Sequence, residues 1–298
     1  MTNQVLAIVG PTATGKTDLS IRLACHFETE ILSADSRQIY KEMSIGTAKP
    51  EPQQLAQVSH YFIGSHSIQE PLNAGIYEQL ALKQLGILFA KKPIAVVVGG
   101  SGLYLQAVCQ GFDDVPASIA DLREQLMQEL DQKGIDFLLN ELSLKDPTYY
   151  SEVDKDNPHR VIRALEVIRS SGETYSSFRQ NTKKARDFKV TKLGILMDRE
   201  VLYQRINLRV ERMMEQGLLK EVESLVPHKK LPALQTVGYK ELFQYLDGEL
   251  SLEKAVDQIK QNTRRYAKRQ LTWFRADPSI VWVKSAEEAL SLLRIKVL

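Results

Sequence analysis

A glycine-rich stretch near the start of the chain has the residue types and spacing of a phosphate-binding loop. It reads AIVGPTATGKT over residues 7–17 and fits the pattern G-x-x-x-x-G-K-[ST] with Gly10, Gly15, Lys16 and Thr17. In such a loop, backbone N–H groups surround phosphate oxygens, the lysine adds positive charge and the hydroxyl ligates Mg²⁺. The pattern predicts a bound di- or triphosphate, which could be transferred, hydrolysed or expelled as a leaving group.

We assign the whole loop to phosphate binding. Its residues are Gly10, Pro11, Thr12, Ala13, Thr14, Gly15, Lys16 and Thr17, the last as the Mg²⁺ ligand. Enzymes that hydrolyse nucleoside triphosphates usually carry a second apolar strand that ends in an Asp, which helps to hold Mg²⁺. The best apolar run here, IAVVVGGSG at residues 94–102, ends in glycines instead.

Asp35, in LSADSRQIY, is the acid that ends a predicted strand nearest to the loop. It has three possible roles: N-cap of the following segment, ligand in the magnesium shell, or general base. The last role fits the carboxyl edge of a parallel sheet, where ligands of such sheets collect.

The elements that must position these residues alternate along the first hundred residues. Apolar runs at residues 4–10, 30–35, 60–64 and 94–100 predict strands, and helical patterns start near residues 17, 74 and 101. This alternation is typical of a parallel sheet with crossover helices.

The pattern changes at about residue 111. Between residues 116 and 178 only amphipathic helical stretches occur, one of them with Asn157 as N-cap, Pro158 in the first turn and Gly172 beyond its end. Strand patterns resume at residues 192–198 and 280–283, with further helices between them. We predict an α/β fold, a P-loop NTPase-like parallel sheet core with crossover helices and an inserted all-helical domain. The predicted ranges are 1–112 and 189–298 for the core and 113–188 for the insertion.

Composition fits an ordinary globular protein of 298 residues, with 43% hydrophobic and 26% charged residues. No apolar run reaches the roughly 18–20 residues of a membrane span, and the N-terminus lacks signal-peptide features, so we expect a cytoplasmic protein. Cys25 and Cys109 are too far apart in sequence to indicate a disulfide framework or a zinc site.

Charge is distributed unevenly, although the net charge is only +2. Residues 254–275 hold seven basic side chains and one acid, whereas residues 120–156 hold ten acids and four bases. This contrast suggests that one surface of the protein binds a polyanion. The alternative is that the basic stretch is a solvated helix face, and charge alone favours this alternative.

The basic stretch NTRRYAKRQLTWFR at residues 262–275 predicts a helix with a buried stripe of Ala267, Leu271 and Phe274. The other faces then carry four bases available for the phosphates of a polyanion: Arg264, Arg265, Lys268 and Arg269. Trp273 is expected to belong to the core together with Phe274.

Six blocks of sequence resemble one family, the tRNA dimethylallyltransferases, also called tRNA isopentenyltransferases. The blocks are GPTATGKT (10–17), SADSRQIYKEMSIGTAKP (33–50), VVGGSGLYLQA (97–107), DNPHRVIRALEV (156–167), TVGYKEL (236–242) and AKRQLTWFR (267–275). They occur in the family's order and span nearly the whole chain.

The resemblance implies transfer of a dimethylallyl group from dimethylallyl diphosphate to N6 of the adenosine at position 37 of tRNA, next to the anticodon on its 3′ side. The phosphate loop would then bind the leaving diphosphate with Mg²⁺, and no phosphoryl group would move. Because an adenine amine is barely basic, a carboxylate that accepts its proton would help, and by its match to the family motif this is Asp35. We expect a monomer whose partners are tRNA, through its anticodon stem-loop, and the donor.

The resemblance also implies further site residues. Arg209 matches an arginine that binds the donor, whereas Arg205 and Arg212, on the same predicted helix face, are expected to be structural. Ser101 matches a small hydroxyl residue that contacts tRNA, and we count it with Asp35 and Arg209 among the expected catalytic residues. The residues implied in tRNA contact are Asp35, Ser36, Arg37, Gln38, Ser101, Arg123, His159, Arg160, Val161, Ile162, Arg163, Gln235, Gly238 and Lys240.

Three other functions compete with this one. A small-molecule kinase could use the loop for ATP, but the missing strand-terminal acid after IAVVVGG disfavours it. An adenylate isopentenyltransferase would prenylate a free nucleotide, and the helical insertion and the basic helix favour a large RNA acceptor instead. A non-catalytic RNA-binding protein is disfavoured by intact Lys16, Thr17 and Asp35.

The chain also departs from the family pattern. SHYFIGSHS at residues 59–67 lacks an Asp that the family often has after the third strand, and the zinc-finger extension of eukaryotic members is absent. We therefore expect the short, bacterial type.

Overall fold

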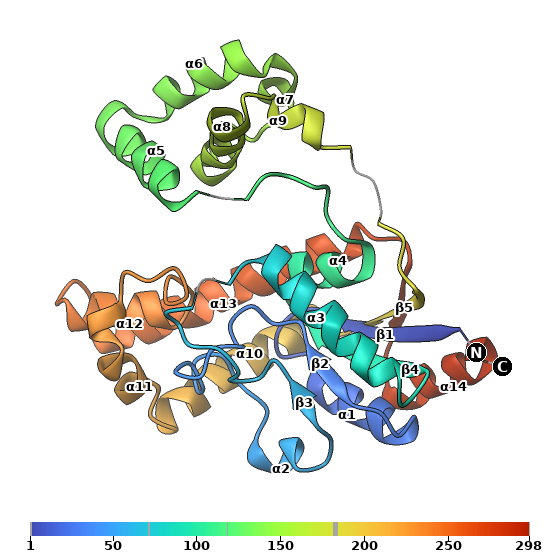
Figure 1. Cartoon of the computed structure of the whole chain (residues 1–298). Coiled ribbons are helices and arrows are strands. Elements are labelled where there is room, and N and C mark those ends of the chain that lie inside the picture. The colour runs from blue at the N-terminus through green and yellow to red at the C-terminus, as the bar shows by residue number, and fades with distance from the viewer. Residues whose placement is uncertain (1, 71, 118, 181–183, 298) are drawn as a thin grey trace. The chain divides into compact units, whose positions relative to one another are not determined.

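Six parallel strands form the sheet that carries the phosphate loop (Figure 1). In chain order they are β1 (Asn3–Val9), β2 (Ile31–Ser33), β3 (His60–Tyr61), β4 (Ile94–Gly99), β5 (Phe188–Ile195) and β6 (Ile280–Val283). Their order across the sheet is β3-β2-β4-β1-β5-β6. The predicted parallel sheet is confirmed, and β4 lies between β1, which leads into the phosphate loop, and β2, which leads to Asp35.

Both faces of the sheet are covered by helices, which explains the unbroken apolar runs of its central strands. On β1, Val5 and Val9 face one hydrophobic cluster and Leu6 and Ile8 face another. The first cluster includes residues of α3 (Ala74–Phe89) and α4 (Gly102–Gln110), and the second includes residues of α1 (Lys16–His26) and α14 (Ala286–Val297). A short helix, α2 (Pro52–Leu55), precedes β3.

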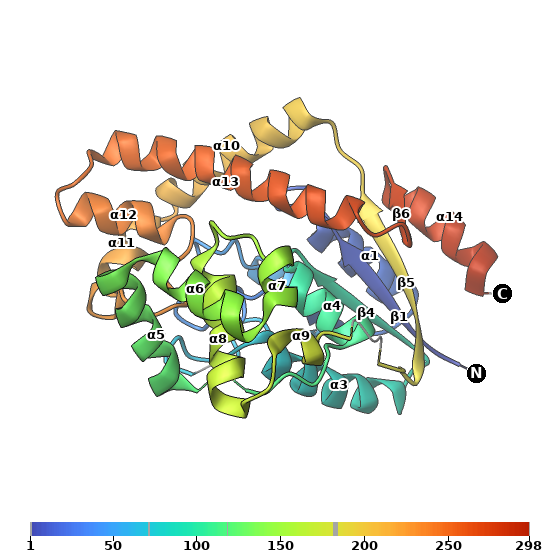
Figure 2. The same cartoon turned by 90° about the horizontal axis from the view of Figure 1, so that it is seen from above.

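Four α-helices and one 3₁₀ helix follow β5 and extend the first cluster beyond the sheet. They are α10 (Arg199–Glu215), α11 (Leu218–Ser224), η1 (Val226–His228), α12 (Tyr239–Leu246) and α13 (Leu252–Arg275). The α13 helix runs beside α10 and α12 (Figure 2). Its N-terminus is capped by Ser251, whose hydroxyl accepts a hydrogen bond from Lys254 N at 3.3 Å. Of the predicted stripe, Ala267 and Phe274 are buried, whereas Leu271 is only half-buried.

Residues 110–185 form a separate unit with its own core. Its helices are α5 (Ala120–Lys133), α6 (Ile135–Lys145), α7 (Pro147–Glu152), α8 (Pro158–Ser171) and α9 (Tyr175–Phe178). Leu126, Leu138 and Leu165 are buried in that core. The predicted N-cap Asn157 is confirmed, since its side chain accepts a hydrogen bond from Arg160 N, and Gly172 ends α8 with φ +77°.

The chain divides into Met1–Cys109 with Arg186–Leu298 and, as the second unit, Gln110–Ala185. The helical unit thus begins and ends three residues earlier than the range 113–188 expected from sequence. Its end differs because Phe188 already pairs with Asn3 as the first residue of β5. The structure describes residues 2–70, 72–117, 119–180 and 184–297, and no helix in these ranges is long and apolar enough to cross a membrane.

Candidate active site

The phosphate loop joins β1 to α1 at the carboxyl edge of the sheet. Gly10 has φ +140° and Gly15 has φ +91°, backbone conformations that glycine adopts most easily. The carbonyl of Pro11 accepts two hydrogen bonds, from Thr14 Oγ1 at 2.9 Å and from Lys16 Nζ at 2.6 Å. The loop is therefore ordered by its own side chains, with the ammonium group held against the backbone.

Positive charge accumulates at this loop without full neutralisation. Burial and, to a lesser extent, the nearby Arg209 guanidinium together lower the pKa of Lys16 to about 7, against an opposing effect of Asp35. Arg209 Nη1 donates a hydrogen bond to Thr12 Oγ1 at 3.0 Å, and burial followed by the charge of Arg205 lowers the pKa of Arg209. Two cationic groups with depressed pKa values in one place indicate a site built for an anion.

Arg205 also lies beside the phosphate loop. Its Nη1 is 4.0 Å from the position that a Cβ on Gly15 would occupy. One helical turn of α10 thus brings both Arg205 and Arg209 to the same loop, and the expectation that Arg205 is structural stays a prediction. Arg212, nearly one turn further along, is exposed.

Asp35 lies beyond the end of β2, two strands from the phosphate loop. Its Oδ1 accepts hydrogen bonds from the backbone N–H groups of Arg37 at 2.9 Å and Gln38 at 3.2 Å. Within the described part of the chain its second oxygen, Oδ2, accepts no hydrogen bond. The cap role considered from sequence thus occupies one oxygen of the carboxylate, and the other is available to a ligand.

Ser101 connects the end of β4 to the segment after Asp35. Its hydroxyl accepts a hydrogen bond from Ser36 N at 2.9 Å and donates one to Ser36 Oγ at 3.1 Å. Gln38 Nε2 donates to the carbonyls of Thr47 and Ala48. Three of the residues expected to contact tRNA, Ser36, Gln38 and Ser101, therefore also hold the segment in shape.

Arg37 lies between Ser36 and Gln38, and its side chain extends toward the loop before α12. Its Nη1 donates a hydrogen bond to the carbonyl of Pro232 at 3.3 Å, and the side chain is half-buried. Within the described ranges no carboxylate forms an ion pair with Arg37, so its charge is available to an anion.

Two aromatic residues of α13 lie beside this edge of the sheet. Desolvation and the charge of Asp35 raise the pKa of Tyr266 to about 12, so the phenol and the carboxylate are close enough to interact. A Cβ on Gly102 would overlap the indole of Trp273, which is 47% exposed. The expectation that Trp273 belongs to the core is wrong, because it shares the helix face of Tyr266 rather than that of Phe274.

Thr17 in the first turn of α1 is half-buried, and its side-chain oxygen makes no hydrogen bond with the described residues. A hydroxyl at this position fits a Mg²⁺ ligand of a phosphate loop. Among the described residues no group of three or more His, Cys, Asp or Glu side chains could hold a metal ion. An ion at this site would therefore take its other ligands from the phosphate oxygens and water, as Mg²⁺ commonly does.

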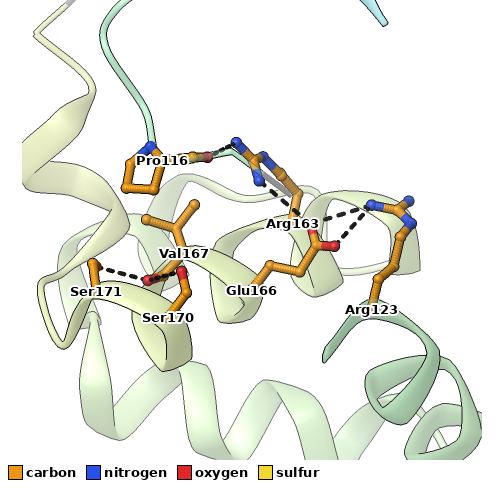
Figure 3. Close-up of polar contacts among 7 residues, drawn as sticks. All are labelled: Pro116, Arg123, Arg163, Glu166, Val167, Ser170 and Ser171. Carbon is orange, nitrogen blue, oxygen red and sulfur yellow. Dashed lines mark hydrogen bonds and ion pairs between the residues drawn. The ribbon is translucent and has the colours of Figure 1, made fainter. Parts of the chain in front are cut away.

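In the helical unit, Arg123 and Arg163 both pair with the buried Glu166 (Figure 3). Arg123 Nη1 lies 3.2 Å from Glu166 Oε2, and Arg163 Nη2 also donates to the carbonyl of Pro116 at 2.6 Å. Near the end of α8 the hydroxyls of Ser170 and Ser171 bond back to the Val167 carbonyl. Both arginines thus stabilise the unit, whatever they contribute to RNA binding.

The start of α8 carries four more residues expected to contact tRNA. His159 and Arg160 are exposed and agree with such a role, but Val161 and Ile162 are buried in the core of the unit. The expectation for these two needs correction, because the helical period turns their side chains inward.

Gln235 and Lys240 are exposed and line an open surface pocket beside α12, together with Lys229 and Lys230. Gly238, with φ +96°, is the buried N-cap residue of α12 and donates its N–H to Glu241 Oε2 at 2.8 Å. None of the residues lining this pocket belongs to the phosphate loop. The pocket is therefore not part of the expected donor site, and it is a candidate only for RNA contact.

The four bases expected on the outer faces of α13 differ in their surroundings. Arg265, Lys268 and Arg269 are exposed. Arg264 is not, because its Nη1 donates to Asn207 Oδ1 of α10 at 2.6 Å and its guanidinium lies 6.0 Å from the centre of the Tyr203 ring. Three bases of α13 are thus available to a polyanion.

Comparisons with known proteins identify the family of the chain. The family model described as IPP transferase matches residues 38–277. A protein of Christiangramia forsetii named tRNA dimethylallyltransferase is 50% identical over 98% of this chain and 97% of its own length. A Bacteroides thetaiotaomicron protein named tRNA dimethylallyltransferase 1 is 48% identical over 98% of this chain and 96% of its own.

Solved structures give the same result. A tRNA isopentenylpyrophosphate transferase from Bacillus halodurans superimposes with a TM-score of 0.69 and 37% identity, covering 95% of this chain and 90% of that one. A eukaryotic dimethylallyltransferase acting on tRNA gives 0.78 and 25%, with coverage of 96% and 75%. The family match spans most of the chain, and the relatives align over nearly all of it. This chain therefore belongs to the IPP transferase family, the family of the tRNA dimethylallyltransferases.

Proposed function

We propose that this enzyme transfers a dimethylallyl group from dimethylallyl diphosphate to N6 of adenosine 37 in tRNA, with diphosphate as the other product. Family membership supports the reaction class. The observation that carries the assignment of roles is that Arg209 reaches the phosphate loop through Thr12, and that the charge of Asp35 acts on both Lys16 and Arg209, favouring a higher pKa for each. A leaving-group site and a proton acceptor are what this reaction needs together.

On the donor side, negative charge grows on the departing diphosphate as the allylic C–O bond breaks or is displaced by the amine. Lys16, Arg209 and the loop amides stabilise that charge. When bound, Mg²⁺ held by Thr17 adds a further positive charge at the phosphate oxygens. Arg205 lies close enough to Gly15 to take part in donor binding.

On the acceptor side, Asp35 takes the proton that N6 loses as the C–N bond forms. Its Oδ1 is fixed by two backbone N–H groups, which orients the carboxylate and leaves Oδ2 for the amine. The adenosine must leave its stack in the anticodon loop to reach this carboxylate. Ser101, which holds Ser36 beside it, orients the same segment.

For the rest of the tRNA we propose contacts from the exposed residues on both units: His159 and Arg160 of α8, Gln235 and Lys240 near α12, and the exposed bases of α13. We propose that the enzyme works in the cytoplasm as a monomer.

The test incubates the protein with labelled dimethylallyl diphosphate and Mg²⁺ together with bulk tRNA, with AMP or with no acceptor. We expect label in tRNA alone, at the adenosine next to the anticodon. Label in AMP would identify an adenylate isopentenyltransferase instead. No transfer to either acceptor would contradict the proposal and leave the kinase and the non-catalytic RNA-binding protein as alternatives.

The binding of inorganic diphosphate should depend on pH through Lys16. In the protein without ligand the pKa of Lys16 is about 7, so the side chain is already charged below pH 7. Above pH 7, Lys16 must take up a proton when diphosphate binds. Affinity should therefore weaken by up to about tenfold per pH unit above pH 7. Calorimetry in two buffers of different ionisation enthalpy measures both the affinity and the proton uptake.

Lys16→Arg is the control for this pH dependence, because a guanidinium stays charged while the ligand's own titration is unchanged. We expect the variant to take up fewer protons at pH 8 than the wild type. Equal proton uptake by both proteins would show that Lys16 does not titrate in this range.

The affinity for tRNA should fall steeply with salt if the exposed bases of α13 bind phosphates. Single replacements of Arg265, Lys268 and Arg269 by Gln should each reduce the slope of log affinity against log salt by about 1. Arg264→Gln should change it less, since that side chain is held by Asn207. The measurement is tRNA binding between low and high salt for two different tRNAs.

Lys254→Gln provides the matched control, because it removes a charge from the first turn of the same helix. An unchanged slope in all three variants would place the RNA site away from this helix.

A further inference from the structure

Gln270 is a buried polar residue of α13 that the family resemblance leaves without a role. It is 7% exposed. Its Oε1 accepts a hydrogen bond from the backbone N–H of Thr12 in the phosphate loop at 2.9 Å. Its Nε2 donates to the carbonyl of Gly100, just beyond β4, also at 2.9 Å. One amide side chain thus bridges the ends of two strands that run side by side.

This bridge completes a chain of hydrogen bonds between the two halves of the site. On the donor side, Arg209 bonds to Thr12, and Gln270 bonds to the same residue. On the acceptor side, Gly100 precedes Ser101, whose hydroxyl holds Ser36 next to Asp35. The β4 terminus lies between the phosphate loop and Asp35, so Gln270 spans the gap where donor and acceptor must meet.

The chemistry of the bridge suits a glutamine. The partners are a backbone donor and a backbone acceptor, and the amide accepts from the first with its oxygen and donates to the second with its nitrogen at any pH. The neighbouring glycine is part of the arrangement, because a Cβ on Gly100 would overlap Gln270 Nε2. A charged carboxylate lacks the donor, and a methionine of similar length lacks both functions.

We propose that Gln270 is a positioning residue for prenyl transfer, holding the donor's phosphate loop at a fixed distance from the Ser101 and Asp35 edge. This inference rests on the proposed function. The reacting carbon must approach N6 to within about 3–3.5 Å, and a displacement of about 1 Å can cost about 10²-fold in rate. Since Gln270 belongs to the helix that carries Arg265, Lys268 and Arg269, it also connects the RNA-facing helix to the donor loop.

The first test compares Gln270→Met with the wild type in single-turnover prenylation of tRNA. We expect the rate to fall by about 10- to 100-fold, whereas the dissociation constants for donor and tRNA stay within about threefold. Gln261→Met is the matched control, since Gln261 is an exposed glutamine on the same helix. A thermal unfolding midpoint for each variant separates lost positioning from lost folding.

Two further variants test the bridge even if Gln270→Met folds poorly. Gln270→Glu restores both hydrogen bonds only when its carboxyl is protonated, so its rate relative to the wild type should rise as the pH is lowered. Gly100→Ala should slow the wild type by displacing Gln270, yet add little to Gln270→Ser, where the clash is gone. Such non-additivity is the signature of a direct contact.

A wild-type rate in Gln270→Met, or additive effects of Gly100→Ala and Gln270→Ser, would overturn the inference while leaving the proposed function intact. A rate that falls only in proportion to the unfolded fraction would likewise reduce Gln270 to a packing residue. If the wild-type protein transfers no prenyl group to tRNA, the proposed function fails and the inference fails with it.

Discussion

Asp35→Asn is expected to slow single-turnover prenylation by about 10²- to 10⁴-fold, the usual effect of losing a well-placed general base. The loss should lie in the chemical step alone. An asparagine Oδ1 can still accept the hydrogen bonds from Arg37 N and Gln38 N that fix the segment. The variant should therefore fold normally and bind donor and tRNA with near wild-type affinity, but its amide cannot take a proton from N6.

The experiment mixes excess enzyme with labelled donor and tRNA and follows transfer in a single turnover. Asp18→Asn is the control, because Asp18 lies in the first turn of α1 and its Oδ1 accepts a hydrogen bond from Gln54 instead. Near-normal transfer by Asp35→Asn would remove Asp35 from proton transfer and leave it only the cap role seen in its backbone contacts.

Local pattern was sufficient to predict the sheet and the phosphate loop. The strands of the sheet are apolar because both sheet faces are covered. The loop pattern lies between a strand and a helix, as the motif requires. The strand bounds differ most at β5, which is Phe188–Ile195 rather than 192–198, and β2 and β3 are shorter than the predicted runs 30–35 and 60–64. The first residues of β5, FKVT, have only a weak strand pattern in the sequence, and they form a strand because they pair with β1.

The site was less predictable, because its contacts join residues far apart in sequence. Gln270 meets Thr12 across 258 positions, and no local pattern singles out a glutamine inside a basic helix. The only signal was periodic: Tyr266, Gln270 and Trp273 share a face at helical spacing that differs from the buried stripe of Ala267 and Phe274. This second face would have indicated that α13 contacts the rest of the protein through these residues as well.

Electrostatic pairing changed the interpretation of several basic residues. Arg123 and Arg163 look like ordinary surface bases in the sequence, whereas both lie against the buried carboxylate of Glu166. Glu166 stands in an apolar helical run, and a carboxylate there needs partners because burying an unpaired charge is costly. Such an acid is the sequence signal that predicts internal arginine contacts.

Arg209→Ala is expected to lower the rate of prenyl transfer by about 10²- to 10³-fold, as when one group that stabilises developing charge is removed. The guanidinium reaches the loop through its hydrogen bond to Thr12, so its loss should also weaken binding of the donor and of inorganic diphosphate. Affinity for tRNA should stay close to normal. Arg212→Ala, an exposed arginine of the same helix, is the matched control, and Arg205→Ala should show an intermediate effect.

Arg209→Ala should also change the pKa of Lys16, which tests the role of Arg209 independently of catalysis. Burial is the main cause of the low pKa of Lys16, and the charge of Arg209 is the next. Removing Arg209 therefore raises that pKa, so the weakening of diphosphate binding with pH should begin above pH 7 instead of at it. Diphosphate calorimetry across pH on wild type, Arg209→Ala and Arg212→Ala measures this shift. An Arg209→Ala protein that kept normal donor affinity but lost tRNA would move Arg209 from the donor site to the acceptor site.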